Sequence, residues 1–223
     1  MPYNLTVKQL EFLTHNVLRI VTDKPEGYSF KPGQATELAL DRDGFRDKKR
    51  PFTFTSLPED SELEFTIKVY PSHDGGTEQL LNLKVGDKIL MGDAWGAIRY
   101  QGKGAFIAGG AGITPFLAIL KDLRRDQNLG GHQLFFANHT QKDIIMKDTL
   151  QAWLGADFHN ILSDQEHEKY PHGYIDKDFL ESNDLDVSNK AYLCGPPEMM
   201  DAVQAELFEM GLSRKQLVTE AFE

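Results

Sequence analysis

The spacing of hydrophobic and polar residues changes near residue 102 of this 223-residue chain. Before that point, short runs rich in β-branched and aromatic residues are separated by turns that contain proline and glycine. Residues 63–69 alternate between apolar and polar side chains, as in a half-buried antiparallel strand. Similar runs predict strands at residues 17–21, 36–40 and 52–55, with one helix at residues 77–83. We therefore predict that residues 1–101 form an antiparallel β-barrel.

From residue 102 onward, short buried strands alternate with longer helical patterns. Strands are predicted at residues 105–108, 134–137 and 191–194, each followed by a helix. In the last helix, apolar residues recur at helical intervals from Met200 to Met210, and Gly211 is suited to end it. This alternation predicts an α/β domain with a parallel sheet over residues 102–223.

Composition limits the classes of function. The formal net charge of −10 argues against nucleic-acid binding, which needs a basic face. A single cysteine excludes an internal disulfide or a cysteine-ligated iron–sulfur cluster within this chain, and the scattered histidines predict no metal site. The first residues lack a signal-peptide pattern and the longest apolar stretch, residues 105–120, is interrupted. We expect a cytoplasmic monomer with no membrane association.

Two glycine turns follow predicted parallel strands. Gly109–Gly112 precedes Thr114, a suitable N-cap, and Pro115, which suits a first helical position. Amides and the helix dipole would favour a pyrophosphate there, although a purely structural turn fits equally well. Residues 195–197 form the second turn, so both turns should lie at the carboxyl edge of one sheet, where α/β proteins bind ligands. Cys194 could line that crevice or be a buried core thiol.

Eight short motifs follow one another along the chain. They are Phe30-Lys31-Pro32-Gly33-Gln34, Arg50-Pro51-Phe52-Thr53, Gly75-Gly76-Thr77, Leu83-Lys84-Val85-Gly86-Asp87, Gly109 to Pro115, Asp143-Ile144-Ile145, Cys194-Gly195-Pro196-Pro197-Glu198-Met199-Met200 and Glu220-Ala221-Phe222. In this order they resemble the ferredoxin-NADP reductase superfamily, in its compact form without fused redox domains. The resemblance implies a flavin-binding barrel at residues 1–101 and a nicotinamide-nucleotide-binding α/β domain at residues 102–223.

The resemblance assigns Arg50 to Thr53 to a flavin, FAD rather than FMN. Arg50 matches an arginine that pairs with a flavin phosphate, with Pro51 beside it. Phe52 replaces the usual tyrosine, so its ring can contact the flavin but a hydroxyl is missing. Thr53 matches the residue near flavin N5, which receives hydride. Without the resemblance, Thr53 would simply be a strand residue.

Further residues of the first half belong to the same implied site. Gly75, Gly76 and Thr77 match a second contact to the flavin pyrophosphate at a helix start, where a plain turn is the alternative. Lys68 is assigned to the cofactor-binding set as well.

The second half is assigned to NADH or NADPH. Its implied cofactor contacts are Gly110, Gly112 and Thr114 for the pyrophosphate, Asn138 and Thr140 near the adenosine ribose, and Cys194, Gly195 and Pro196 beside the nicotinamide. Residues 138–142 contain no arginine for a 2′-phosphate, which marginally favours NADH, although Lys142 or protonated His139 would suit NADPH.

The implied reaction passes hydride from NAD(P)H to bound FAD and then single electrons to a carrier such as flavodoxin or ferredoxin. Its catalytic residues are Thr53, Cys194, Glu220 and Phe222, the last as a movable cover of the flavin, although simple fraying of the chain end would explain it too. A reductase subunit of an oxygenase system and a non-catalytic nucleotide-binding module are the alternatives.

Basic residues gather on the segment 41–50 of this otherwise acidic chain. They are Arg42, Arg46, Lys48, Lys49 and Arg50. The segment either attracts an acidic electron carrier or is a solvated loop balanced by Asp41, Asp43 and Asp47.

Overall fold

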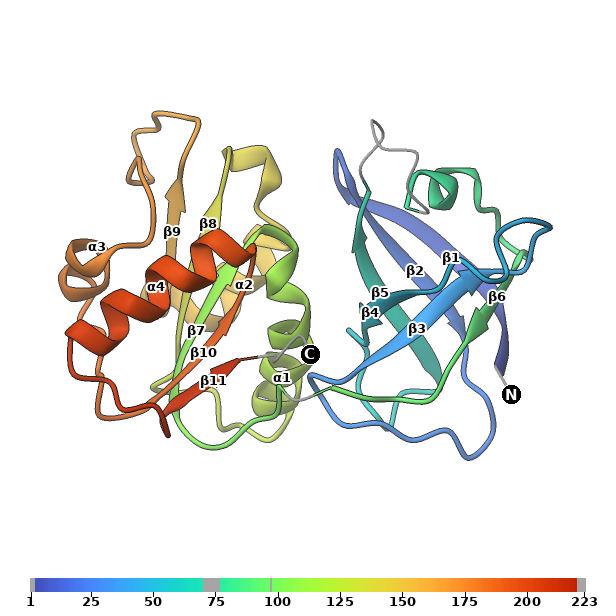
Figure 1. Cartoon of the computed structure of the whole chain (residues 1–223), viewed down its shortest axis with the longest axis horizontal. Helices are drawn as coiled ribbons and strands as arrows, with labels where there is room; N and C mark the ends of the chain where they lie inside the picture. The colour runs from blue at the N-terminus through green and yellow to red at the C-terminus, as the bar shows by residue number, and fades with distance from the viewer. Residues whose placement is uncertain (1–2, 70–76, 97, 220–223) are drawn as a thin grey trace.

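The strands of this computed structural model form two sheets, which lie side by side (Figure 1). The structure describes residues 3–69, 77–96 and 98–219. The six-stranded sheet is built from strands that end by Met91, and the five-stranded sheet from strands that begin at Gly104. The predicted fold class is therefore confirmed.

The first sheet is antiparallel throughout and has the order β4-β3-β6-β1-β2-β5. Its elements are β1 (Tyr3–Thr14), β2 (Val17–Asp23), β3 (Ala35–Leu40), β4 (Arg50–Thr53), β5 (Glu62–Lys68), the short 3-10 helix η1 (Glu78–Asn82) and β6 (Lys88–Met91). A bridge between Phe54 and Phe65 brings the two edge strands together. Both rings are fully buried in the barrel core.

The second sheet is parallel and has the order β11-β10-β7-β8-β9. Its domain contains β7 (Gly104–Gly109), η2 (Gly110–Ile113), α1 (Thr114–Arg125), β8 (Gln133–Asn138), η3 (Gln141–Asp143), α2 (Lys147–Leu154), η4 (Gly155–Asp157), β9 (Phe158–Leu162), α3 (Lys177–Ser182), β10 (Lys190–Cys194), α4 (Pro197–Glu209) and β11 (Leu217–Thr219).

Helices cover both faces of the parallel sheet. Apolar residues of α1 and α2 share one core cluster, and those of α3 and α4 share another. Within this domain, the chain starts at the central strand β7 and continues outward through β8 and β9. It then returns to the other side of β7 as β10. The strand order thus reverses between β7 and β10, and ligands bind beyond the carboxyl ends of strands at such a reversal.

Candidate active site

A cleft of about 930 Å³ lies between the barrel and the α/β domain. From the barrel it is lined by Ala35, Pro51, Thr53, Lys68 and Trp95. From the α/β domain it is lined mainly by residues that follow β7, β8, β9 and β10, including residues 109–112, 137–139 and 194–196. One cavity therefore contains many of the residues that the sequence analysis assigns to cofactor binding: Thr53, Gly110, Gly112, Thr114, Asn138, Cys194, Gly195 and Pro196.

The two glycine turns are in direct contact at the point of strand reversal. A Cβ at residue 112 would lie 2.2 Å from the Cys194 carbonyl oxygen and 2.7 Å from the Gly195 amide nitrogen. Gly195 is similarly close to Gly109, with an added Cβ 3.2 Å from the Gly109 amide nitrogen. Only residues without side chains allow this approach, and it leaves backbone facing the cleft.

Gly110 and Lys68 bring the two domains together at this turn. Gly110 has a φ of +51°, a conformation that favours glycine. An added Cβ there would lie 3.9 Å from the Nζ atom of Lys68, which comes from the end of β5 in the barrel. A barrel ammonium thus stands beside the glycine turn of the other domain, where it can attract an anion.

Helix α1 begins one residue earlier than the sequence predicts. Thr114 is its first residue and the N-cap position is Ile113, so the prediction of Thr114 as N-cap was wrong. The Thr114 hydroxyl donates a hydrogen bond to the Ala111 carbonyl at 3.0 Å, which stabilises the preceding 3-10 turn. The Thr114 amide donates to the Ala111 carbonyl oxygen and Pro115 has no N–H, so the helix start offers the cleft the positive end of its dipole and not free amides at these two positions.

Asn138 places an unsatisfied amide in the cleft. It ends β8 and is only 7% exposed, yet neither its Nδ2 nor its Oδ1 atom has a hydrogen-bond partner in the described structure. A buried amide without partners costs free energy, so such a group indicates a position where a ligand or water completes the hydrogen bonds.

A polar cluster that the sequence analysis missed lies at the far end of the cleft. His139 and Ser163 line the cavity, and the His139 Nδ1 atom lies 3.1 Å from both the Ser163 Oγ and the Asp164 Oδ2 atoms. The Ser163 hydroxyl donates to Asp164 at 2.7 Å. These hydrogen bonds from Ser163 and His139 lower the pKa of Asp164. The exposed ring of Tyr174 lies along the same edge.

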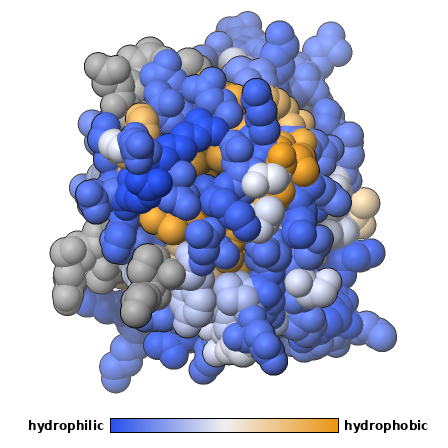
Figure 2. All heavy atoms as spheres, turned by 90° about the vertical axis from the view of Figure 1, so that its right-hand side faces the viewer, coloured by the Kyte–Doolittle hydropathy of each residue, from blue (hydrophilic) through white to orange (hydrophobic). Residues whose placement is uncertain are grey.

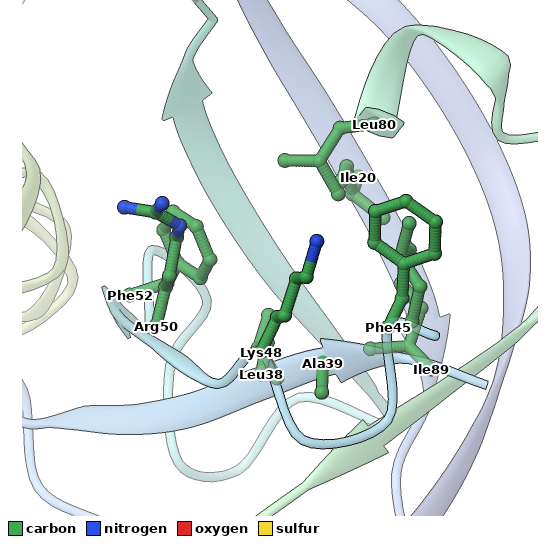
Figure 3. Close-up of a pocket in the computed structure, with 10 residues that line it drawn as sticks. Ile20, Leu38, Ala39, Phe45, Lys48, Arg50, Phe52, Leu80 and Ile89 are labelled. Atoms are coloured by element: carbon green, nitrogen blue, oxygen red, sulfur yellow. The ribbon is translucent and has the colours of Figure 1, made fainter. Parts of the chain in front are cut away.

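Arg50 and Phe52 line a second, smaller pocket on the other side of β4 (Figure 3). Successive strand residues point to opposite sides, which separates this pair from Pro51 and Thr53 in the cleft. The charged ends of Arg50 and Lys48 extend in the same direction, and Lys48 lies over the ring of Phe45. Within the described residues, neither cation has a carboxylate within ion-pair distance. The pocket can therefore receive an anion.

The other cations of segment 41–50 are paired. Arg42 contacts Asp87 at 2.6 Å, Arg46 contacts Asp41 and Asp43 at 2.6 and 2.5 Å, and Lys49 lies 3.6 Å from Glu37. The hydrogen bonds that Arg46 donates to Asp41 and Asp43 raise the pKa of Arg46. These pairs favour the interpretation of a balanced, solvated loop over that of a docking patch.

Cys194 fits both interpretations offered by the sequence. Its side chain belongs to the core under α1, and the residue also lines the cleft at the end of β10. Trp95, to which the sequence analysis assigns no role, is 41% exposed in the cleft. Its backbone forms two 2.8 Å hydrogen bonds with Ala35, which fix the indole beside β3.

The remaining predicted residues lie elsewhere or are not described. Thr77 precedes η1, and the Thr140 hydroxyl donates to Asp143 at 2.7 Å, so Thr140 caps η3 and does not line the cleft. Gly75, Gly76, Glu220 and Phe222 lie outside the described residues.

Residues 3–69, 77–96 and 98–219 contain no group of three or more potential metal-ligating side chains. No helix in these ranges has the length and apolar character needed to cross a bilayer.

Two family models match the chain in the order of its domains. The model of an FAD-binding domain matches residues 2–89, and that of an oxidoreductase NAD-binding domain matches residues 106–205. The cleft thus lies between a flavin-binding unit and a nicotinamide-nucleotide-binding unit.

Curated relatives are similar over nearly the whole chain. The chain is 26% identical to the ferredoxin–NAD(P)(+) reductase component of the naphthalene 1,2-dioxygenase system of Pseudomonas putida, covering 97% of this chain and 68% of the relative. It is 29% identical to the reductase component of propane 2-monooxygenase from Rhodococcus jostii, covering 97% and 62%. NADH-cytochrome b5 reductase 1 of Emericella nidulans is 27% identical, with 97% and 76% covered. The chain therefore spans about two thirds of the length of the two oxygenase-system relatives.

Solved structures share the fold. The flavohem-like FAD/NAD-binding domain of nitric oxide dioxygenase from Vibrio cholerae is 20% identical, with a TM-score of 0.86 and 97% of each chain covered. A ferredoxin NADP+ reductase from Neisseria gonorrhoeae with bound FAD and NADP is 21% identical, with a TM-score of 0.84 and 98% of each chain covered.

Proposed function

Because the chain belongs to the ferredoxin-NADP reductase superfamily and is an NAD(P)H-dependent flavin oxidoreductase, we propose that it uses bound FAD to pass electrons from NADH to a separate one-electron carrier protein. The observation that supports this most directly is the cleft, because both domains contribute residues to one cavity of about 930 Å³. Ring stacking between two cofactors needs such a shared, partly enclosed space.

The barrel fits a flavin along β4. This strand lies at the edge of its sheet, so a long ligand can pass from the small pocket on one side to the cleft on the other. The cations of Arg50 and Lys48 suit the phosphates, and the Arg50 guanidinium can bind them in a bidentate way. Half-buried Thr53 then faces the reacting end of the flavin from the cleft side.

The α/β domain fits a dinucleotide along the carboxyl edge of its sheet. The glycine turns, the positive end of the α1 dipole and the Lys68 ammonium together suit a pyrophosphate. The Asn138 amide would gain partners from a bound nucleotide.

When bound, FAD would supply the chemistry of accepting a hydride from a reduced nicotinamide and releasing electrons one at a time. The protein needs no nucleophile or general base for this reaction. Thr53 would orient the flavin from the barrel, while Cys194 and Gly195 would hold the nicotinamide against it. Trp95 and the walls of the cleft keep water from the reacting rings.

NADH is the proposed donor because of the cluster at the end of β9. The Asp164 carboxylate lies 3.1 Å from the Nδ1 atom of His139, and His139 lines the cleft directly after β8, where an adenosine ribose would end. A carboxylate can accept a hydrogen bond from a ribose 2′-hydroxyl but repels a 2′-phosphate.

Two classes of protein are candidates for the electron acceptor. Two of the relatives are reductase components of oxygenase systems, which favours an oxygenase component or its ferredoxin as the acceptor. A stand-alone reductase of flavodoxin or ferredoxin is the second candidate. Three further expectations stay predictions. They are the domain division between residues 101 and 102, which falls between β6 and β7, the monomeric state and the cytoplasmic location.

The test is reconstitution followed by turnover. Purified protein should take up FAD, show flavin absorbance and reduce an artificial one-electron acceptor with NADH. Replacing that acceptor in turn by a ferredoxin, a flavodoxin and an oxygenase component then identifies the acceptor class. Folded protein that binds no FAD, or FAD-loaded protein whose flavin is not reduced by either nicotinamide, would refute the proposal.

A further inference from the structure

A buried ion-pair network connects the two domains next to the proposed site. The Nζ atom of Lys121 on α1 donates to the Thr55 carbonyl oxygen at 2.5 Å and to Glu64 Oε1 at 2.7 Å. Glu64, on β5, also accepts hydrogen bonds from Arg19 at 2.7 Å and from the Thr55 hydroxyl at 2.9 Å. One barrel carboxylate thus receives donors from both domains.

The network is shielded from solvent. The side chain of Glu64 is 14% exposed and that of Lys121 is 21% exposed, while Thr55 is fully buried. Screening by water and salt is weak at such positions, so this pair fixes geometry more firmly than a surface pair does. The exposed pair of Arg125 with Glu59, one turn further along α1, also crosses the interface.

The network joins two segments that line the cleft. Thr114 and Pro115, at the start of α1, line the cavity, and Lys121 lies two helical turns later, about 10 Å along the axis. Thr55 is two residues after Thr53, and its amide is fixed by a 2.8 Å hydrogen bond to the Glu64 carbonyl oxygen. Lys121 therefore links the proposed pyrophosphate-binding helix start to the strand that carries Thr53.

We propose that Lys121 is a positioning residue for hydride transfer, holding the nucleotide-binding end of α1 at a set distance from Thr53 through Glu64 and Thr55. This inference rests on the proposed function. Lys121 would contact neither cofactor, and its effect would be on the alignment of the two rings. A shift of about 1 Å in such an arrangement lowers a transfer rate by roughly a hundredfold.

The test variant is Lys121→Met, which removes the ammonium but keeps a long unbranched side chain, and Glu64 keeps Arg19 as a partner. The matched control is Arg124→Met, because Arg124 is an exposed cation of the same helix that packs over Trp153 within its own domain. Lys121→Arg serves as the conservative variant. Circular dichroism and FAD content verify that each variant is folded and loaded.

The first readout is single-turnover reduction of the FAD-loaded protein by NADH. For Lys121→Met we expect the limiting rate to fall roughly tenfold or more while the NADH dissociation constant stays within about threefold, with partial recovery in Lys121→Arg. Arg124→Met should match the wild type. If Lys121 had only a structural role, Lys121→Met would instead lower the FAD content or the NADH affinity, and the limiting rate would not fall selectively.

The second readout is independent of activity. Spin labels at Gln9→Cys and Glu181→Cys, exposed sites in the two domains, report the interdomain distance in a Cys194→Ala background used only for this measurement. Lys121→Met should broaden the distance distribution, and Arg124→Met should not. If Lys121→Met changes only one of the two readouts, or neither, the positioning role is refuted. A wild-type protein whose flavin NADH cannot reduce would instead refute the proposed function.

Discussion

At the scale of single residues, one carboxylate accounts for the proposed choice of donor. Asp164 is exposed, but Ser163 and His139 hold it in place through contacts of 2.7 and 3.1 Å. The hydrogen bonds that lower its pKa keep it charged near neutral pH. A fixed negative charge there discriminates against a donor that carries an additional phosphate.

Replacing Asp164 by asparagine should therefore admit NADPH. In the variant we expect kcat/KM for NADPH to rise roughly fivefold or more, with a smaller change for NADH, because the repulsion at an exposed site is modest. Steady-state kinetics with both donors measure this ratio. Glu166→Gln is the matched control, since Glu166 is an exposed acid two residues further along the same loop, and the contacts with Ser163 and His139 that fix Asp164 belong to Asp164. An unchanged ratio in Asp164→Asn would contradict the assignment.

Several residues of the site could not be found from sequence because their positions depend on tertiary contacts. Ser163 and Tyr174 reach the cleft only because β9 is the outer strand of the parallel sheet, and the sequence analysis predicted no strand there. Trp95 depends on its backbone pairing with Ala35, 60 residues earlier. Gly112 and Cys194, by contrast, were predicted because glycine turns after strands have a local pattern.

At the scale of elements, the turn between β7 and α1 depends on the absence of a side chain at residue 112. Gly112→Ala would place a Cβ 2.2 Å from the Cys194 carbonyl oxygen, and backbone cannot move away as a flexible side chain can. The two glycine turns must then separate, at a cost of about 1–3 kcal/mol, as for overpacked sites in general.

We expect Gly112→Ala to weaken NADH binding by roughly tenfold or more and to leave FAD content unchanged, because its contacts belong to the α/β domain alone. Titration of FAD-loaded protein with NAD⁺ and a flavin absorbance spectrum measure the two effects. Gly130→Ala is the matched control, since an added Cβ there meets nothing within 4 Å. Equal NAD⁺ affinity in both variants would show that the turn is not part of the site.

Most helices and strands could be predicted from local sequence patterns. The strands that could not be predicted in this way have a common cause. The strands at residues 17–21, 36–40 and 63–69 and the helix that ends before Gly211 have clear periodicity and were confirmed. β1, β6 and β11 were not predicted, because pairing with neighbouring strands, more than their own sequence, defines them. The start of α1 differed because the Thr114 hydroxyl bonds to Ala111 within the preceding 3-10 turn.

At the scale of the whole molecule, the proposed active site lies between the two domains and not on their outer faces. The side of the barrel that points away from the α/β domain is mostly hydrophilic, with small separate apolar areas (Figure 2). On segment 41–50, Arg42, Arg46 and Lys49 are paired with carboxylates, and the proposed function assigns Lys48 and Arg50 to the flavin phosphates. An acidic carrier would thus gain little from that segment, and the approach to the cleft is the more favourable place for electron transfer.

The same interface makes the free energy of unfolding depend on pH. Burial alone would raise the pKa of Glu64, but the charge of Lys121 and the hydrogen bonds from Lys121, Arg19 and Thr55 outweigh it and lower the pKa. A lowered pKa in the folded state means that the stabilisation is complete above the ordinary pKa of 4.5 and is lost as pH falls through the folded-state value. Acid should therefore loosen the contact between the domains.

Glu64→Gln isolates this effect. The melting temperature of the wild type should exceed that of the variant by a few degrees near pH 7, and the difference should shrink as pH falls below 4.5 and through the folded-state pKa, because protonation removes from the wild type the charge that the variant already lacks. Scanning calorimetry across this range measures it. Glu59→Gln, which removes an exposed acid of the same interface, should change the melting temperature little at any pH, since a surface pair contributes little. A wild-type advantage that stays constant with pH would mean that Glu64 stabilises the interface by packing and not by charge.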